Sequence, residues 1–361
     1  MGTGAHGGLV DDIVTLTEMI GPTGYEDGVQ DWLEKRWSEA GCATYRSRIG
    51  NLFARVGGSG PKLLIAAHAD EISLRVKAVS ADGHLLLTSG TGRSELDPPN
   101  ATYLAQPCVV VTPQGHVPGI VGCATGHVMT KAQREAPRRD WSDIFLDIGA
   151  RSREEALHWG VHVGAPVVPS VPTRRIGGNL VGKAMDDRAA LAVMTQLLER
   201  IDRDRLAFEL WFGSTVQEEI GLVGAGSVAG FDLAIALEIG LAGDIPPVGL
   251  DHIPARLGQG PILGHKDGAV AYDVKLTRRL QAVAERQGIP IQQLVFLNFT
   301  SDGRAFMAND VPTALLAFPT RYSHSPVETV DERDLEAVTR LLAAFVVQAP
   351  GAADPGALVA P

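Results

Sequence analysis

The sequence predicts an α/β fold in which helices flank a mixed sheet and a small β-barrel-like domain is inserted into the chain. Three observations lead to this fold class. Four apolar runs are typical of strands covered on both faces, at residues 62–68, 208–212, 233–239 and 313–318. Amphipathic segments with helical spacing lie at about residues 187–201, 272–287 and 331–348. Between these segments, residues 74–176 form short β-like pieces divided by Gly and Pro, which is typical of a small barrel.

These segments divide the chain into two predicted domains and a tail. Residues 1–73 and 177–350 form the main α/β domain, and residues 74–176 form the inserted β-rich domain. Residues 351–361 are rich in Ala, Pro and Gly and are expected to form a flexible tail.

The smaller elements follow the same patterns. Two helical segments open the chain, the second over about residues 26–40, and residues 50–57 have the pattern of a strand. A short helix at about residues 152–159 interrupts the inserted domain. Residues 260–267 are predicted to be a loop, and a strand is expected near residues 293–297.

Composition and charge exclude several classes of protein. The 361 residues are 45% hydrophobic and 20% charged, as in ordinary soluble globular proteins. No run of 18 apolar residues occurs and the N-terminus lacks a signal-peptide pattern, so we expect no membrane partner. The net charge of −10 disfavours nucleic acid. Cys42, Cys108 and Cys123 lack metal-binding spacing, which predicts reduced thiols in a cytoplasmic protein.

The stretch from Gly213 to Gly221 carries a strong functional signal. An apolar strand leads into two adjacent acids, Glu218 and Glu219, before a glycine turn. Neighbouring strand residues point to opposite sides of a sheet, so we expect one carboxylate to bind a metal and the other to move protons. An isolated pair of this kind is more often a solvated strand end, and residues elsewhere in the chain decide between the two interpretations.

Further acids and histidines stand at the ends of other predicted elements. His68 and Asp70 follow the strand at residues 62–68, and the spacing i, i+2 places them on one side of an extended backbone. A carboxylate beside a metal-binding imidazole typically orients it. Asp186 and Asp187 stand at the start of a helix, where acids serve as caps or as ligands.

Glu238 and His324 complete this pattern. Glu238 lies near the end of one core strand and His324 lies just past another. Sites of open α/β sheets lie at the carboxyl ends of strands, so we expect five residues to converge: His68, Asp186, Glu219, Glu238 and His324. Two imidazoles and three carboxylates suit Zn²⁺ or Co²⁺, with Mn²⁺ a further candidate, and could hold two ions.

The segments around these residues resemble the M42 family of metallo-aminopeptidases, which includes the tetrahedral and glutamyl aminopeptidases. The matching segments cover nearly the whole chain, at Gly21–Tyr25, Ala67–Ile72, Asp147–Ala150, Gly182–Arg188, Thr215–Gly221 and Arg321–Pro326. The resemblance implies that the main α/β domain is a zinc-peptidase-like catalytic domain. It also implies removal of N-terminal residues from short peptides.

The resemblance implies a role for each candidate ligand. Asp186 would bridge two divalent metal ions. His68 and Glu238 would complete the ligands of one ion, and Glu219 and His324 those of the other.

The resemblance also assigns roles beyond the ligands. Glu218 would be the general base and Asp70 would orient His68. The peptide bond between Asp186 and Asp187 would be a candidate for the cis form.

Two segments depart from the family pattern. Glu238-Ile-Gly-Leu-Ala stands where the family commonly has an aspartate, and the longer side chain changes the reach of that ligand. Thr300-Ser-Asp-Gly303 stands where the family has Gly-Thr-Asp-Ala. The second change would affect substrate choice if this loop shapes the substrate pocket.

Four alternative functions compete with an aminopeptidase. An amidohydrolase or deacylase would use the same site on a non-peptide amide, and a non-catalytic assembly protein would retain the ligands without activity. A retaining glycosidase is disfavoured because adjacent strand residues point apart, whereas its two carboxyl groups must lie about 5–5.5 Å apart. A serine hydrolase is disfavoured because no Gly-X-Ser-X-Gly motif occurs in the chain.

The inserted domain bears on assembly. In the M42 family this domain helps to build dimers and a hollow tetrahedral dodecamer. The resemblance therefore implies that this chain associates with copies of itself, as a dimer or up to a dodecamer.

Overall fold

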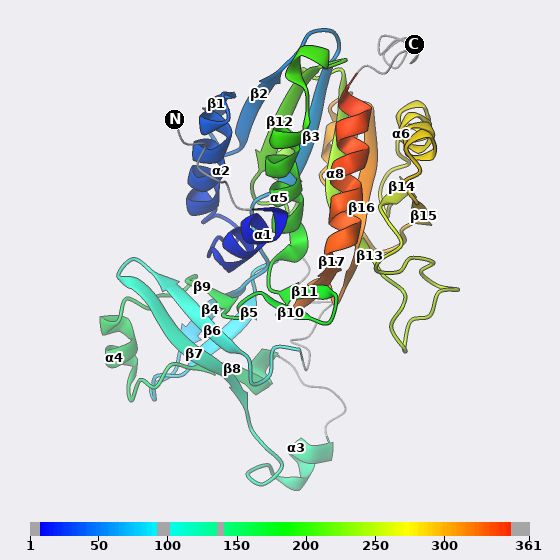
Figure 1. The fold of residues 1–361 in the computed structure, drawn as a ribbon. Helices are drawn as coiled ribbons and strands as arrows, with labels where there is room; N and C mark the ends of the chain where they lie inside the picture. Colours follow the sequence, from blue (N-terminus) through cyan, green and yellow to red (C-terminus); the bar gives the residue numbers. More distant parts are fainter. Residues whose placement is uncertain (1–7, 92–101, 136–140, 348–361) are drawn as a thin grey trace.

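The computed structural model describes residues 8–91, 102–135 and 141–347 (Figure 1). The predicted tail at residues 351–361 lies outside the described residues. The described chain forms a large mixed sheet with helices on both faces and a separate closed barrel, which confirms the predicted fold class.

Four parallel strands form the centre of the sheet. In sheet order they are β12 (Glu209–Thr215), β3 (Lys62–His68), β13 (Leu233–Leu241) and β16 (Thr313–Arg321). Their residues are almost entirely buried, as expected for strands covered on both faces. Because the strands are parallel, their carboxyl ends lie along one edge of the sheet. The register pairs Thr215 with His68 and Glu238 with Ala317.

Antiparallel and short strands complete the sheet around this centre. Beyond β12 lie β2 (Leu52–Gly57) and β1 (Ala43–Arg46), and β14 (Ile262–Lys266) pairs with β16 and with β15 (Gln292–Val295). The carboxyl-terminal end of β16 pairs with β17 (Glu328–Asp331), which continues to β11 (Asn179–Gly182) and β10 (Arg174–Ile176).

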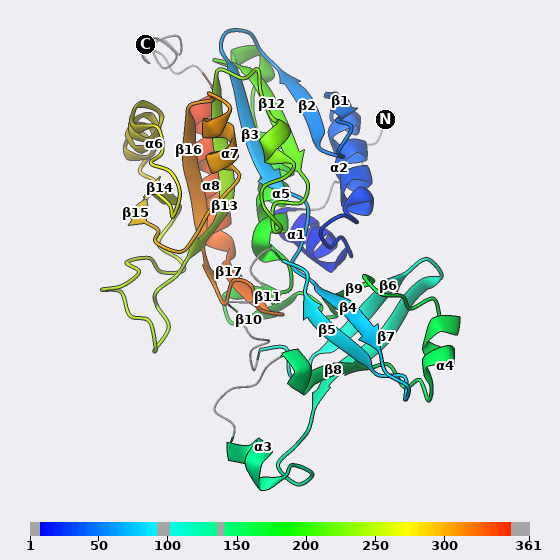
Figure 2. The same ribbon diagram turned by 180° about the vertical axis from the view of Figure 1, so that it is seen from behind.

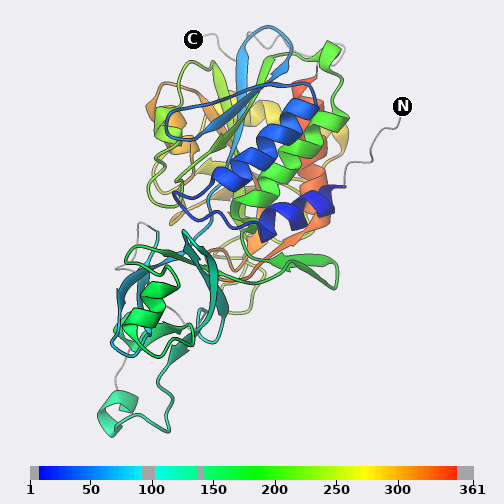
Figure 3. The ribbon, with the colours of Figure 1, turned by 90° about the vertical axis from the view of Figure 1, so that its left-hand side faces the viewer.

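Helices cover the two faces of the sheet unequally. One face carries a large apolar core beneath α1 (Leu9–Glu18), α2 (Asp27–Glu39), α5 (Met185–Arg200), α6 (Val274–Gln287) and α8 (Glu332–Val346). The opposite face carries a smaller core, which includes Phe306 of α7 (Gly303–Ala308) and Ala225 of the short 3₁₀ helix η3 (Ala225–Ser227). Figure 2 shows α7 on this second face, and Figure 3 shows α2 and α5 packed side by side on the first.

The inserted segment forms a closed six-stranded barrel with its own apolar core. The strands close in the order β4 (Leu74–Val79), β5 (Leu85–Ser89), β8 (Ile144–Asp147), β7 (Gly115–Cys123), β6 (Pro107–Thr112) and β9 (Pro166–Pro169). The barrel lies beyond the edge of the sheet at which β3 ends (Figures 1 and 3). Four short helices complete the described chain, namely α3 (Lys131–Glu135), η1 (Trp141–Asp143), α4 (Arg153–His158) and η2 (Arg203–Arg205).

One local prediction is wrong. Residues 260–267 were expected to form a loop, but Ile262–Lys266 form strand β14 beside β16. Gly260 and Pro261 are typical of a turn, whereas Ile262 and Leu263 are fully buried against the core. Pairing with a long neighbouring strand therefore outweighs the local turn signal.

In the described part of the chain, no helix combines the length and the apolarity that crossing a bilayer requires.

Candidate metal centre

The histidines and acids predicted from the sequence meet where the central strands end. His68 is the last residue of β3, and Asp70 follows it in the chain that leads to the barrel. Glu238 lies within β13, three residues before the strand ends at Leu241. His324 follows β16 in a tight turn, with a positive φ of 60°.

Asp186 faces both histidines. Its Oδ1 lies 2.9 Å from Nε2 of His68, and its Oδ2 lies 3.5 Å from Nε2 of His324. Glu238 Oε1 lies 3.7 Å from the same nitrogen of His68, and Glu219 Oε2 lies 3.2 Å from Nε2 of His324. The carboxylate of Asp186 thus stands between two groups, each with one imidazole and one further carboxylate.

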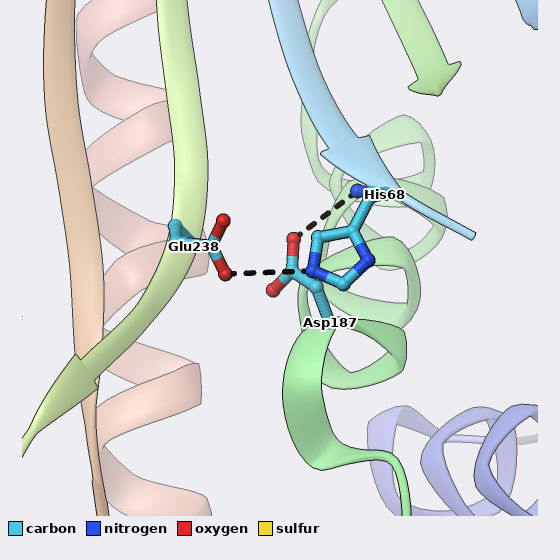
Figure 4. A group of neighbouring side chains, drawn as sticks. All are labelled: His68, Asp187 and Glu238. Carbon is cyan, nitrogen blue, oxygen red and sulfur yellow. Dashed lines mark hydrogen bonds and ion pairs between the residues drawn. The ribbon is translucent and has the colours of Figure 1, made fainter. Parts of the chain in front are cut away.

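The start of α5 places Asp186 and Asp187 by leaving helical geometry. Both residues have non-helical backbone angles, and the peptide bond between them is cis. Asp187 Oδ2 accepts a hydrogen bond from the backbone N–H of His68 at 3.3 Å. Figure 4 shows Asp187 and Glu238 directed toward His68, and one ligand atom from each of the three lies within 4.8 Å of the others. Asp187 is therefore a further carboxylate at the centre.

Glu218 and Glu219 do not sit on opposite sides of a strand, so that prediction is wrong. Strand β12 ends at Thr215, and the two glutamates follow in a turn where Gln217 has a φ of 56°. Carboxylate oxygens of both glutamates and a ring nitrogen of His68 lie within 4.8 Å of one another. The geometric argument against a glycosidase therefore fails.

Asp70 holds this turn in place. Its carboxylate accepts hydrogen bonds from the backbone N–H groups of Glu218 at 2.9 Å and Glu219 at 3.2 Å, and from Thr23 Oγ1 at 2.8 Å. Nδ1 of His68 lies 3.1 Å from the backbone oxygen of Asp70 and 3.5 Å from its carboxylate Oδ1. Asp70 thus connects the imidazole of His68 to the turn that carries both glutamates.

Sequence reasoning missed two buried acids, one that holds candidate ligands and one at the end of β12. Glu328 accepts hydrogen bonds from the backbone N–H of Asp186 at 2.9 Å and of His324 at 3.0 Å. Asp302 accepts a short hydrogen bond from the hydroxyl of Thr215, at the end of β12. The spacing of Glu328 four residues after His324 is the only local signal for its role.

Burial and the proximity of several acids shift the pKa values of the candidate ligands. Burial raises the pKa of Glu219 to about 7 and, with Asp187 and Asp186 nearby, raises the pKa of Glu238 well above its usual value. Burial acts in the same direction on Asp186, but the adjacent imidazoles lower its pKa below the usual value. The charge of Glu219 raises the pKa of His324 to about 10. The centre therefore holds more carboxylate than its two imidazoles can neutralise.

These residues fit divalent cations. Glu219 Oε1 and Asp187 Oδ1 are buried and have no hydrogen-bond partner among the described residues. An unpaired buried carboxylate oxygen is costly, and a cation would satisfy it. The mixture of imidazole nitrogens and carboxylate oxygens is the donor set that Zn²⁺ and similar ions bind.

Comparison with known proteins places this centre in a family. A model of M42 glutamyl aminopeptidases matches residues 50–341. The chain belongs to the M42 peptidase family. It is therefore a peptide-bond hydrolase of a metal-dependent aminopeptidase family, as the sequence motifs predicted. This match favours a peptidase over the glycosidase alternative.

Individual relatives agree over most of their length. The lysyl aminopeptidase of Pyrococcus furiosus is 31% identical, with 92% of this chain and 94% of the relative covered. The TET aminopeptidase of a marine-sediment Thaumarchaeota archaeon is 29% identical with a TM-score of 0.89, covering 97% and 98%. The TET1 peptidase of Pyrococcus horikoshii, which can assemble into a tetrahedron or a large octahedral shell, is 27% identical with a TM-score of 0.83, covering 94% and 100%.

Proposed function

We propose that this chain is a dinuclear aminopeptidase that removes N-terminal residues from short peptides. The main support is the position of Asp186: one of its carboxylate oxygens faces His68 and the other faces His324. A carboxylate placed in this way suits a bridging ligand. Glu238 beside His68 would complete one ligand group, and Glu219 beside His324 would complete the other.

The donor set favours Zn²⁺ or Co²⁺, with Mn²⁺ a third candidate. When bound, two such cations supply the Lewis acidity that lowers the pKa of a water molecule and polarises the scissile carbonyl. The buried carboxylates also favour a positively charged group, which suits the free α-amine of a peptide N-terminus.

Glu218 is the proposed general base. Its carboxylate lies in one group with His68 and Glu219, and Asp70 fixes its backbone N–H. From this position Glu218 takes the proton of the attacking water and delivers it to the leaving amine. Asp70 is the positioning residue, because it contacts both the turn of Glu218 and the ring of His68.

Replacement of Glu218 by glutamine tests the base assignment. Glu218→Gln keeps the size of the side chain and removes its basicity, so kcat should fall by about 100-fold or more. Metal content, measured by mass spectrometry of the purified protein, should not change. Glu285→Gln, at an exposed position on α6, is the matched control. Full activity of Glu218→Gln would refute the assignment.

A substrate comparison separates the aminopeptidase from an amidohydrolase that uses the same residues. Aminoacyl anilides and short peptides with a free amine should be hydrolysed, whereas N-acyl amino acids should not. The reverse preference would indicate a deacylase.

Self-association is a further part of the proposal. Five large apolar side chains are more than two-fifths exposed on the barrel segment, namely Leu86, Ile120, Val128, Leu157 and Val163. Exposed apolar groups of this size suit a surface that is covered by another copy. A cytoplasmic location is a further prediction, supported by Cys42, Cys108 and Cys123, which form no disulfide within the described residues.

A further inference from the structure

A cavity of about 530 Å³ adjoins the candidate metal centre. Its walls come from the start of β4, from the end of β5 and from the turn that carries His324. His324 lines this cavity and also lies 3.2 Å from Glu219. The cavity therefore shares a wall residue with the centre, and its volume lies within the range of about 300–1,000 Å³ that small-molecule sites have.

The chemistry of its walls is neutral. Aromatic rings come from Tyr103, Trp141 and Tyr322, and aliphatic groups from residues such as Leu74 and Val327. Among the described residues that line the cavity, none is Asp, Glu, Lys or Arg. The polar groups are hydroxyls, the indole N–H of Trp141, the imidazole of His324 and the backbone.

We propose that this cavity receives the side chain of the substrate's N-terminal residue and selects uncharged side chains, apolar and aromatic ones above all. The proposal rests on the aminopeptidase function. A Lys, Arg, Glu or Asp side chain would lose its hydration in the cavity and find no opposite charge on the described walls, which is strongly unfavourable. Leu, Phe or Met would instead gain from the burial of apolar surface against the aromatic walls.

The amino-terminal side of the scissile bond is favoured over the leaving side. An aminopeptidase substrate has a single residue on its amino side, and a cavity of about 530 Å³ can hold one side chain. The chain on the leaving side continues and needs an open path. Residues 300–303, which differ from the family pattern, are absent from the described lining, so that loop does not set this selectivity.

A series of aminoacyl-methylcoumarylamides tests the proposal. The Leu, Phe and Met substrates should have kcat/KM values about 100-fold or more above the Lys, Arg, Glu and Asp substrates. Faster hydrolysis of a charged substrate would overturn the selectivity. In dipeptides, a preference that follows the second residue and not the first would overturn the assigned side. If no aminoacyl substrate is hydrolysed at all, the proposed function itself fails.

Substitutions that introduce a negative or a positive charge at one cavity position test the selectivity further. Ser89 lines the cavity at the end of β5, and its hydroxyl bonds to Thr91. Ser89→Asp should raise the Lys-to-Leu ratio of kcat/KM about tenfold, and Ser89→Lys should raise the Glu-to-Leu ratio by a similar factor. Ser59→Asp, in an exposed loop, is the control and should change neither ratio.

Variants at a second cavity position allow the same test if a Ser89 variant does not fold. Thr91 also lines the cavity, and Thr91→Asp and Thr91→Lys should repeat the two shifts if either Ser89 variant fails to fold. Unchanged ratios in folded variants at both positions would refute the placement of the side chain in this cavity.

Discussion

Glu71 and Lys183 form a buried ion pair close in sequence to the candidate ligands His68 and Asp186. Lys183 Nζ lies 2.6 Å from Glu71 Oε2 and donates a second hydrogen bond to the backbone oxygen of Met19 at 2.8 Å. The other oxygen of Glu71 accepts from the backbone N–H of Gly21 at 2.9 Å. The pair therefore ties the loop after α1 to the segments that carry His68 and Asp186.

Loss of one partner of this pair should be costly. Lys183→Met removes the cation and leaves the carboxylate of Glu71, which is 1% exposed, without its opposite charge. We expect a loss of about 3–5 kcal/mol in the free energy of unfolding, measured with urea. Lys35→Met, at a side chain that is 74% exposed, is the control and should cost less than about 0.5 kcal/mol. A Lys183→Met variant as stable as the control would contradict the argument.

At the scale of single residues, the candidate ligand residues were easier to predict than the directions in which their side chains point. Each proposed ligand was recognisable because a polar residue followed or entered an apolar run, as His68 does after residues 62–67. The relation between Glu218 and Glu219 was predicted wrongly, because the positive φ of Gln217 ends strand geometry before either acid. Glu328 was missed because its role depends on backbone groups that are distant in sequence or folded into a turn.

At the scale of elements, α8 is joined to a neighbouring loop through Asp334. This residue lies in the first turn of α8 and accepts hydrogen bonds from the backbone N–H groups of Gly258 at 2.6 Å and Gly260 at 2.7 Å. Burial raises the pKa of Asp334 to about 6, although both hydrogen bonds act in the opposite direction. The folded state thus binds this proton more tightly than the unfolded state does.

A pH dependence follows from that shift. A raised folded-state pKa gives a contribution to stability that is complete below the ordinary value of 3.8 and is lost as the pH rises through about 6. Relative to Asp334→Asn, the wild type should lose about 1 kcal/mol between about pH 5 and about pH 7.5. Urea unfolding of both proteins measures this difference, with the exposed Asp251→Asn as the control. A difference that stays constant or grows in favour of the wild type would contradict the prediction.

The long elements and some short ones, such as α4, were predictable, whereas strands β14 and β17 were not. The strand at residues 62–68 and the helices near 187–201, 272–287 and 331–348 agree closely with β3, α5, α6 and α8, because each has a long periodic or apolar pattern. Short strands such as β14 and β17 derive their stability from pairing with β16, which local sequence does not encode.

At the scale of the whole molecule, the barrel gives the protein a second surface. It lies beyond the edge of the sheet at which β3 ends (Figure 2). Residues of β4 and β5 also form part of the cavity wall. Assembly through the barrel would therefore place neighbouring copies close to the route by which peptides reach the centre.

The molecular mass in solution tests the proposed self-association directly. Light scattering after size-exclusion chromatography should give a mass that is a multiple of the 38.2 kDa chain, between a dimer and a dodecamer. The double variant Ile120→Asp/Val163→Asp places charges at two exposed apolar positions of the barrel and should lower that mass. The matched control is Val274→Asp, at an exposed position of α6 outside the barrel. A wild-type mass of a single chain would contradict self-association.

Metal analysis tests most directly whether distant segments of the chain converge on two divalent ions. After saturation with Zn²⁺ or Co²⁺ and removal of free metal, the wild type should retain about two ions per chain. His68→Ala and His324→Ala should each retain about one, and Asp186→Ala should retain fewer than either because it would contact both ions. Wild-type protein that retains no metal, or Asp186→Ala that retains both ions, would contradict the proposed centre.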